Sequence, residues 1–211
     1  SPTHEEIIED MLSLRGGPCG HYNPFMNEVL RHCGFDSKLV PAWMKGKLSH
    51  MAITVMIEDE DWWLDFGNGH PYLTPIRIGT DTIHTHAGLA YRIRTNSDGK
   101  YALEHRLPND EWFSENYTFT NEGVPFSFFD EMVKAHYTTP DFGPFLQGVR
   151  FIRFPEGEML AIRDDQLLRT IDGEMEKERI GDISKMEKII DSSFQQATYP
   201  LRKGLEALGW S

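Results

Sequence analysis

The stretch Arg15-Gly16-Gly17-Pro18-Cys19 separates two predicted helices and places a cysteine at the start of the second. Ahead of it, Thr3-His4-Glu5-Glu6 has the pattern of a capping box, and an apolar stripe follows at Ile7, Ile8, Met11, Leu12 and Leu14. Proline is favoured at the first helical position, so the second helix is expected to begin at Pro18 or Cys19 and to end at Gly34. Its inward side chains are expected to be Phe25, Met26, Val29 and Leu30. Cys19 then lies in the first helical turn, where unpaired backbone N–H groups and the helix dipole favour the reactive thiolate.

Alternating apolar residues predict strands after this helix, at residues 35–44, 50–57 and 62–66. The last two are expected to form a hairpin. If its two-residue turn is Glu58-Asp59, Asp65 falls opposite Ala52, on the face of His50 and about 7–8 Å from it along a diagonal. A turn centred half a residue further on moves Asp65 to the opposite face, and a turn at Asp59-Glu60 moves it too far along the strand.

Cys19, His50 and Asp65, in this order, provide what a thiol nucleophile, its base and the orienter of that base require. A cysteine at a helix start is more commonly a small buried apolar residue, so the combination carries the interpretation rather than any one residue. We interpret the chain as a cysteine-dependent acyl-transfer enzyme with these three residues as its catalytic groups.

The remainder of the chain predicts an α+β protein rich in antiparallel strands. The expected strands are residues 89–96, 101–107, 112–119, 148–154, 159–163, 167–171 and 175–180, and the expected helices are residues 125–136, 184–197 and 201–208. We divide the chain into a catalytic core at residues 1–80, an antiparallel β domain with one inserted helix at residues 81–180, and a C-terminal helical region at residues 181–211.

Composition limits the kinds of molecule that the protein is expected to bind and the compartment in which it is expected to work. The net charge of −12 and the lack of a basic cluster argue against nucleic acid. No apolar run has the roughly 20 residues that a membrane helix needs. Cys19 and Cys33 would lie about 21 Å apart on one helix, too far for a disulfide, which favours a reducing, cytoplasmic compartment. His84 and His86 have no third ligand nearby, so we expect no metal.

Residues 15–23, Arg-Gly-Gly-Pro-Cys-Gly-His-Tyr-Asn, resemble the arylamine N-acetyltransferase signature, in which Arg-Gly-Gly-x-Cys is followed by Glu and Asn. Ser49-His50 and the apolar residues after it resemble the histidine strand of that family. Asp65-Phe66-Gly67-Asn68-Gly69 resembles its Asp-Val-Gly-Phe-Gly loop, at the matching fifteen-residue spacing. A looser resemblance extends through Tyr91-Arg92-Ile93 and residues 126–139, so it covers nearly the whole chain.

The resemblance implies a transglutaminase-like or cysteine-protease-like core of helices and strands, a β-barrel-like second domain and a helical lid. It implies a ping-pong reaction in which Cys19 takes an acyl group from acetyl-CoA or another acyl-CoA and passes it to a small amine or hydrazine, with no permanently bound cofactor. Backbone N–H groups of the loop at Gly67, Asn68 and Gly69 are candidates for binding coenzyme A or substrate. The residues expected to shape the site are Arg15, Gly16, Gly17 and Asn23.

Three departures from the family pattern bear on these expectations. Only eighteen residues precede Cys19, so the family's N-terminal helices are expected to be largely absent. His21 stands where the family has Glu, so any pairing with Arg15 must be rebuilt. Asn68 replaces an aromatic residue that lies beside the acceptor in the family, which argues against an aromatic amine.

Other functions also fit these residues. The donor could be an acyl group on a carrier protein, as in an amide synthase. The same three residues also serve cysteine hydrolases and transglutaminase-type enzymes, because pocket shape decides whether water or an amine resolves the acyl-enzyme. A non-catalytic binding domain is the third alternative.

Overall fold

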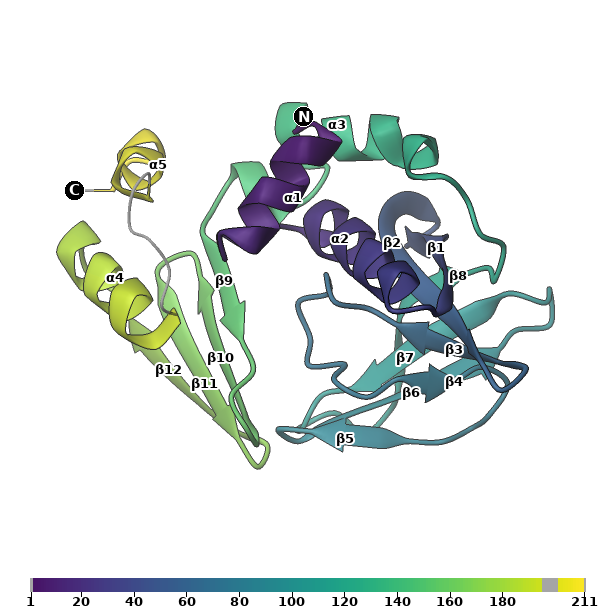
Figure 1. The fold of residues 1–211 in the computed structure, drawn as a ribbon. Coiled ribbons are helices and arrows are strands. Elements are labelled where there is room, and N and C mark those ends of the chain that lie inside the picture. The colour runs from purple at the N-terminus through teal and green to yellow at the C-terminus, as the bar shows by residue number, and fades with distance from the viewer. Residues whose placement is uncertain (1, 195–200, 211) are drawn as a thin grey trace.

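The computed structural model describes residues 2–194 and 201–210, which form two antiparallel sheets with helices packed against each (Figure 1). The strands of the larger sheet lie in the order β4-β3-β2-β1-β8-β7-β6-β5. Their bounds are β1 (Asp36–Met44), β2 (Lys47–Ile57), β3 (Glu60–Leu64), β4 (Ile76–Arg77), β5 (His84–His86), β6 (Leu89–Thr95), β7 (Tyr101–Arg106) and β8 (Ser114–Phe119). The smaller sheet contains β9 (Arg150–Arg153), β10 (Glu158–Arg163), β11 (Gln166–Ile171) and β12 (Glu174–Arg179). The chain is therefore an α+β protein, as the sequence predicts.

The helices divide between the two sheets. Helices α1 (His4–Leu12) and α2 (Cys19–His32) lie with α3 (Asp130–Thr138) beside the larger sheet, and α4 (Ile183–Ile189) covers the smaller one (Figure 1). Further helical segments are η1 (Phe126–Phe129), η2 (Pro144–Leu146), η3 (Ile190–Phe194) and α5 (Leu201–Ala207). The expected helix at residues 184–197 is present as far as Phe194, and its last three residues lie outside the described residues. Within the described ranges, no helix has both the length and the apolar character needed to cross a bilayer.

Three apolar clusters hold these layers together. The larger sheet packs Val40, Trp63, Tyr91, Leu103 and Phe119 into one of them. A second cluster joins the smaller sheet to α4 and α5. The third lies beneath α2 and α3 and includes Cys19. Cys19 is thus at the interface between a helix layer and the larger sheet.

The first two helices confirm the predicted boundaries but not every predicted buried residue. Thr3 and Glu6 form both hydrogen bonds of the capping box, and α2 begins at Cys19. Leu12 and Leu14 are 70% and 75% exposed, however, and Val29 is 37% exposed, so the expectation that they pack inward was wrong. The buried face of α2 instead carries Cys19, Asn23 and Asn27, which are spaced four residues apart on one side of the helix. The Asn23 side chain ties this face to the larger sheet, because it donates a hydrogen bond to the Met51 carbonyl oxygen of β2.

The hairpin of β2 and β3 has the register on which the site depends. Glu58 and Asp59 form its turn with φ values of 52° and 61°, as a two-residue turn of type I′ requires. Ile53 pairs with Leu64, so continuing the register by one residue sets Asp65 opposite Ala52. The register expected for a Glu58-Asp59 turn is confirmed.

The larger sheet crosses the expected boundary at residue 80. β1 to β4 and β5 to β8 form its two halves, which are joined where Ala42 pairs with Phe119 and Trp43 with Thr118. The proposed limit between residues 80 and 81 thus lies between the two edge strands of one sheet. The division into three domains stays a prediction.

Candidate active site

Cys19 occupies the first position of α2 and is only 3% exposed. Pro18, in an extended conformation, precedes it as the helix cap. The loop after β3 closes over the cysteine at Gly67, because a Cβ added to Gly67 would lie within 2.8 Å of the Cys19 Cβ and closer still to its Cα. Only a residue without a side chain allows this approach.

His50 and Asp65 form a buried pair beside this cysteine. The His50 Nε2 atom lies 2.7 Å from the Asp65 Oδ2 atom, and the two residues are 3% and 7% exposed. The charge of Cys19 also acts on the His50 ring and raises its pKa. Because Nε2 faces Asp65, Nδ1 is the ring nitrogen left for the thiol. The structure therefore brings together the three residues that sequence reasoning selected.

The Asp65 carboxylate accepts hydrogen bonds from several residues. Its Oδ1 atom accepts hydrogen bonds from the Asn23 amide and the Gly67 N–H, each at 3.0 Å. Its Oδ2 atom accepts one from the Tyr117 hydroxyl at 2.8 Å, in addition to the contact with His50. A buried carboxylate with this many donors is held in its charged form and in one orientation.

Electrostatics around the pair favour opposite charges. Burial by itself disfavours a charged imidazole, but the charges of Asp65 and Cys19 and their hydrogen bonds outweigh it and raise the pKa of His50 to about 10. Burial likewise works against the charge of Asp65. The His50 charge and the donors on Asn23 and Tyr117 nevertheless lower the pKa of Asp65 below its ordinary value. His50 is therefore protonated and Asp65 ionised at neutral pH.

Asn23 connects the helix to both sides of the hairpin. Its amide donates to the Met51 carbonyl oxygen at 2.7 Å as well as to Asp65, and its side-chain oxygen accepts from the Phe66 N–H at 3.0 Å. The sequence selected Asn23 only through the family motif. Its position explains that motif, because four residues after Cys19 a helical side chain lies on the same face as the cysteine.

Tyr117 is the contact that sequence reasoning missed. It lies 52 residues from Asp65 in the chain, in β8, and its hydroxyl also accepts a hydrogen bond from the Trp63 indole N–H at 3.0 Å. No local pattern distinguishes it from the other aromatic residues of the β domain. Only the pairing of β1 with β8 brings it to the site.

Replacing Tyr117 with Phe should lower the free energy of unfolding by about 1–3 kcal/mol, because Trp63 would lose its buried acceptor and Asp65 one donor. Urea denaturation measures the change. Tyr101→Phe is the matched control, since it removes a hydroxyl from β7 of the same sheet that has no hydrogen bond within residues 2–194 and 201–210. An equal loss in both variants would contradict the role assigned to the Tyr117 hydroxyl.

The loop at Gly67, Asn68 and Gly69 makes several of its contacts within the protein. The N–H of Gly67 is engaged by Asp65, and the Asn68 amide donates to the Asn116 side chain at 3.1 Å and to Asp65 at 3.4 Å. A Cβ on Gly69 would lie 3.2 Å from Ile152 of the smaller sheet. Binding of coenzyme A by this loop stays a prediction, and the Gly67 N–H already has a protein acceptor.

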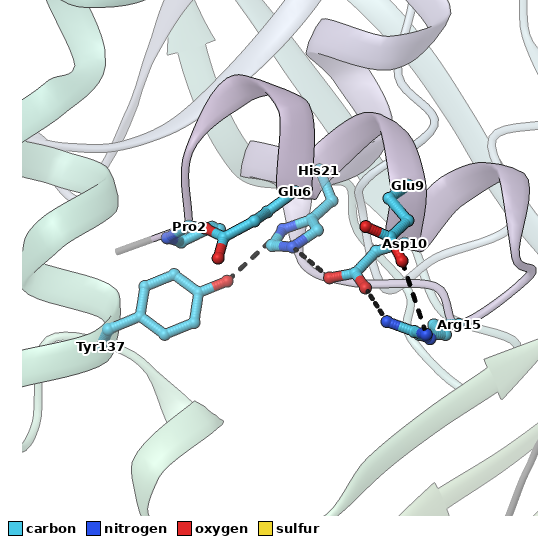
Figure 2. Close-up of a pocket in the computed structure, with 7 residues that line it drawn as sticks. All are labelled: Pro2, Glu6, Glu9, Asp10, Arg15, His21 and Tyr137. Carbon is cyan, nitrogen blue, oxygen red and sulfur yellow. Dashed lines mark hydrogen bonds and ion pairs between the residues drawn. The ribbon is translucent and has the colours of Figure 1, made fainter.

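Arg15 pairs with Asp10, an aspartate that sequence reasoning did not select, in place of the Glu that the family has at the position of His21. Asp10 of α1 binds the Arg15 guanidinium at 2.8 Å with one oxygen and lies 3.7 Å from the His21 Nε2 atom with the other (Figure 2). Gly17 packs against the His21 ring so closely that an added Cβ would lie 2.6 Å from the His21 Cβ. Gly16 has a φ of 72°, a conformation that glycine adopts without strain.

The two histidines of the His84-x-His86 pair have other contacts. The His84 ring stacks on Tyr91, and the His86 Nε2 atom lies 3.1 Å from the Glu158 carbonyl oxygen. In the described part of the chain, no group of three or more His, Cys, Asp or Glu side chains could hold a metal ion. Cys19 and Cys33 are both free thiols.

The chain shares this fold and site with a known protein family. A family model described as N-acetyltransferase matches residues 3–197. The uncharacterized acetyltransferase YvcN of Bacillus subtilis is 26% identical over 202 residues, covering 89% of this chain and 77% of YvcN. The chain therefore belongs to the arylamine N-acetyltransferase family, as its motifs predict.

Solved structures share the fold. Mycobacterium marinum arylamine N-acetyltransferase in complex with CoA superposes with a TM-score of 0.86 at 19% identity, covering 98% of this chain and 80% of that one. An arylamine N-acetyltransferase from Bacillus cereus, described as having a unique Cys-His-Glu catalytic triad, gives a TM-score of 0.77 at 24% identity over 92% and 79% of the two chains.

Proposed function

We propose that the chain transfers an acyl group from an acyl-CoA, acetyl-CoA in the first instance, through a thioester on Cys19 to a small amine. The observation that carries this proposal is the buried His50–Asp65 pair, 2.7 Å apart, beside a cysteine at a helix start. The coenzyme in the Mycobacterium marinum structure supports a CoA thioester as donor, and the Bacillus cereus relative supports a cysteine, a histidine and a carboxylate as catalytic groups. The two free cysteines fit a reducing, cytoplasmic location.

The first half-reaction forms the acyl-enzyme. His50 already holds the proton of Cys19 in the resting ion pair, and the thiolate attacks the thioester carbonyl. As the new C–S bond forms, the bond to coenzyme A breaks, and the proton on His50 passes to the departing sulfur. Asp65 stabilises the imidazolium and holds Nδ1 toward the cysteine, while Tyr117 and Asn23 hold Asp65.

The second half-reaction transfers the acyl group to the amine and regenerates free Cys19. Acylation removes the negative charge of Cys19, which is one of the two charges that raise the pKa of His50. The ring is then free to accept a proton from a neutral amine as its nitrogen attacks the carbonyl. The C–N bond of the product forms, and Cys19 leaves as the thiolate.

The arrangement around these groups leads us to propose a transglutaminase-like core in which helix α2 presents Cys19 to the β2–β3 hairpin. Arg15, Gly16 and Gly17 shape the entry into α2, and Asn23 ties that helix to the hairpin. Gly67 lies against Cys19, and we propose that coenzyme A or substrate approaches through the loop of Gly67, Asn68 and Gly69.

Incubation with acetyl-CoA and longer acyl-CoAs should add one acyl group to the protein, and Cys19→Ala should abolish this adduct because it removes the only proposed nucleophile. Intact-protein mass spectrometry measures the adduct, and adding an amine should remove it. Cys33→Ala is the matched control, since Cys33 is an exposed free thiol at the other end of α2. Labelling that follows Cys33, or no adduct with any acyl-CoA, would contradict the proposal. A hydrolase is distinguished by loss of the adduct in water at the same rate as with amine.

A further inference from the structure

The two faces of the smaller sheet have different neighbours. Phe151 and Ile162, which lie opposite each other on β9 and β10, pack in the apolar cluster of α4. The adjacent pair, Ile152 and Ala161, faces the other way, because successive side chains of a strand alternate between the two faces. A Cβ on Gly69 would lie 3.2 Å from the Ile152 side chain. This second face is therefore directed toward the loop that follows β3.

Three arginines lie in one row across this second face. Arg150 is two residues from Ile152 and shares its face, and Arg163 of β10 lies directly opposite Arg150. The row continues through Gln166 of β11 to Arg179 of β12. Like charges directly opposite each other destabilise a sheet, so the pairing of Arg150 with Arg163 favours an anion between them.

Arg163 is the member of this row that has no carboxylate partner. Arg150 forms an ion pair with Asp164, and Arg179 forms one with Asp165 at 2.9 Å. Within residues 2–194 and 201–210, no Asp or Glu forms an ion pair with the exposed Arg163 side chain. Burial and the like charge of Arg150 lower the pKa of Arg163, which is the opposite of what a bound carboxylate does. An arginine stays charged in spite of such a shift, so Arg163 presents an uncompensated cation.

This cation lies across the loop from the reactive cysteine. Gly67 lies against Cys19 at one end of the loop, and Gly69 meets the arginine-bearing face of the smaller sheet at the other. The next residue, His70, has a pKa lowered to about 3, chiefly by burial, and the charge of Arg163 adds to this effect. The loop thus has the nucleophile on one side and an unpaired guanidinium on the other.

We propose that Arg163, together with Arg150, binds a phosphate group of the acyl donor, so that the enzyme prefers thioesters of phosphopantetheine to thioesters without phosphate. This inference deepens the proposed function and rests on it. Two guanidinium groups on directly opposed residues can hold several phosphate oxygens at once. The pantetheine arm separates the thioester from the phosphate, so a phosphate site must lie away from Cys19. The net charge of −12 repels such a donor, which makes local positive charge necessary.

The test compares the acylation of Cys19 by acetyl-CoA and by S-acetylpantetheine, which has the same reactive arm without phosphate. Rapid-quench mass spectrometry of the intact protein gives the second-order rate constant for each donor below saturation. The wild-type protein should prefer acetyl-CoA, and in Arg163→Gln this preference should fall about tenfold, because a charge-assisted hydrogen bond to phosphate is lost. The rate with S-acetylpantetheine should stay the same. An equal fall for both donors, or an unchanged preference, would overturn the inference.

Arg169→Gln is the matched control. Arg169 carries the same charge on the opposite face of the same sheet, where it lies opposite Leu160 and pairs with Glu158. The donor preference should keep its wild-type value in this variant, and a fall equal to that of Arg163→Gln would contradict the role of Arg163. Arg163→Gln should also leave the free energy of unfolding undiminished, since it removes a like-charge contact with Arg150.

S-acetyl-4′-phosphopantetheine shows which phosphate is bound. It carries only the phosphate that coenzyme A shares with the prosthetic group of a carrier protein. A slower reaction of Arg163→Gln with this donor would assign Arg163 to the shared phosphate, and an effect confined to acetyl-CoA would assign it to the phosphates that only coenzyme A carries.

Binding of coenzyme A separates this inference from the proposed function. Calorimetry of the Cys19→Ala protein, with and without Arg163→Gln, measures binding when no acyl group is transferred. We expect Arg163→Gln to weaken binding about tenfold. A missing Cys19 adduct would overturn the proposed function, whereas unchanged binding would overturn the role of Arg163, so the two failures are distinguishable.

Discussion

Acylation of Cys19 should slow by about a thousandfold when Asp65 is replaced by Asn, within the range of 10²–10⁴ typical of general acid–base groups. Asn keeps the shape of the side chain but not the charge that raises the pKa of His50. Without that charge the pKa of His50 should fall, because burial disfavours the charged ring and Asp65 no longer opposes it. Rapid-quench mass spectrometry with acyl-CoA measures the rate, and NMR titration of labelled histidine measures the pKa.

The effect of Asp65→Asn on the free energy of unfolding should depend on pH. The raised pKa of His50 contributes stability that is fully present below 6.5 and is lost as pH rises toward 10. The lowered pKa of Asp65 contributes stability that is present above 3.8 and is lost at lower pH. The difference in unfolding free energy between the wild type and Asp65→Asn should thus be largest between pH 3.8 and 6.5.

Asp59→Asn is the matched control for this prediction. Asp59 lies in the turn of the same hairpin with a φ of 61°, a conformation that Asn tolerates as well as Asp. We expect it to change neither the acylation rate nor the His50 titration. A normal acylation rate in Asp65→Asn would show that the buried pair has no part in activating the cysteine.

Replacing Gly67 with Ala should reduce acylation at least a hundredfold and lower the unfolding free energy by about 1–3 kcal/mol. The added methyl group would lie 2.8 Å from the Cys19 Cβ, 3.0 Å from the Asn23 amide nitrogen, and closer still to the Cys19 Cα. Backbone atoms cannot move away as a flexible side chain can. Either the loop carrying Asp65 or the start of α2 must shift, and both positions determine the geometry of the nucleophile.

Gly69→Ala provides the comparison two residues further along the same loop. Its methyl group would meet only the end of the Ile152 side chain, at 3.2 Å, which can rotate aside. We expect a stability change below about 1 kcal/mol. Acylation kinetics and thermal unfolding of both variants test the pair. Equal effects at the two glycines would show that contact with Cys19 is not what requires Gly67.

Much of the site could be predicted from local sequence. The Pro18-Cys19 boundary follows from the preference of proline for helix starts, and the register of Asp65 follows from a two-residue turn at Glu58-Asp59. Both depend on residues within a few positions of one another. The buried face of α2 could not be predicted from apolar periodicity, because its inward residues Asn23 and Asn27 are polar, and the Asn23 side chain gains its partners from distant segments.

Local sequence is enough to predict the cap of α1, the start of α2, the hairpin turn, and the order of cysteine, histidine and aspartate. These arise from backbone preferences and short-range hydrogen bonds, which depend on neighbouring residues. Tertiary packing is what brings Tyr117 to Asp65 across 52 residues, pairs Asp10 with Arg15, and sets Gly67 against Cys19. Those contacts require two strands or layers to pack together. The burial that this packing produces strengthens the electrostatic interactions of the site, and no local sequence pattern predicts that effect.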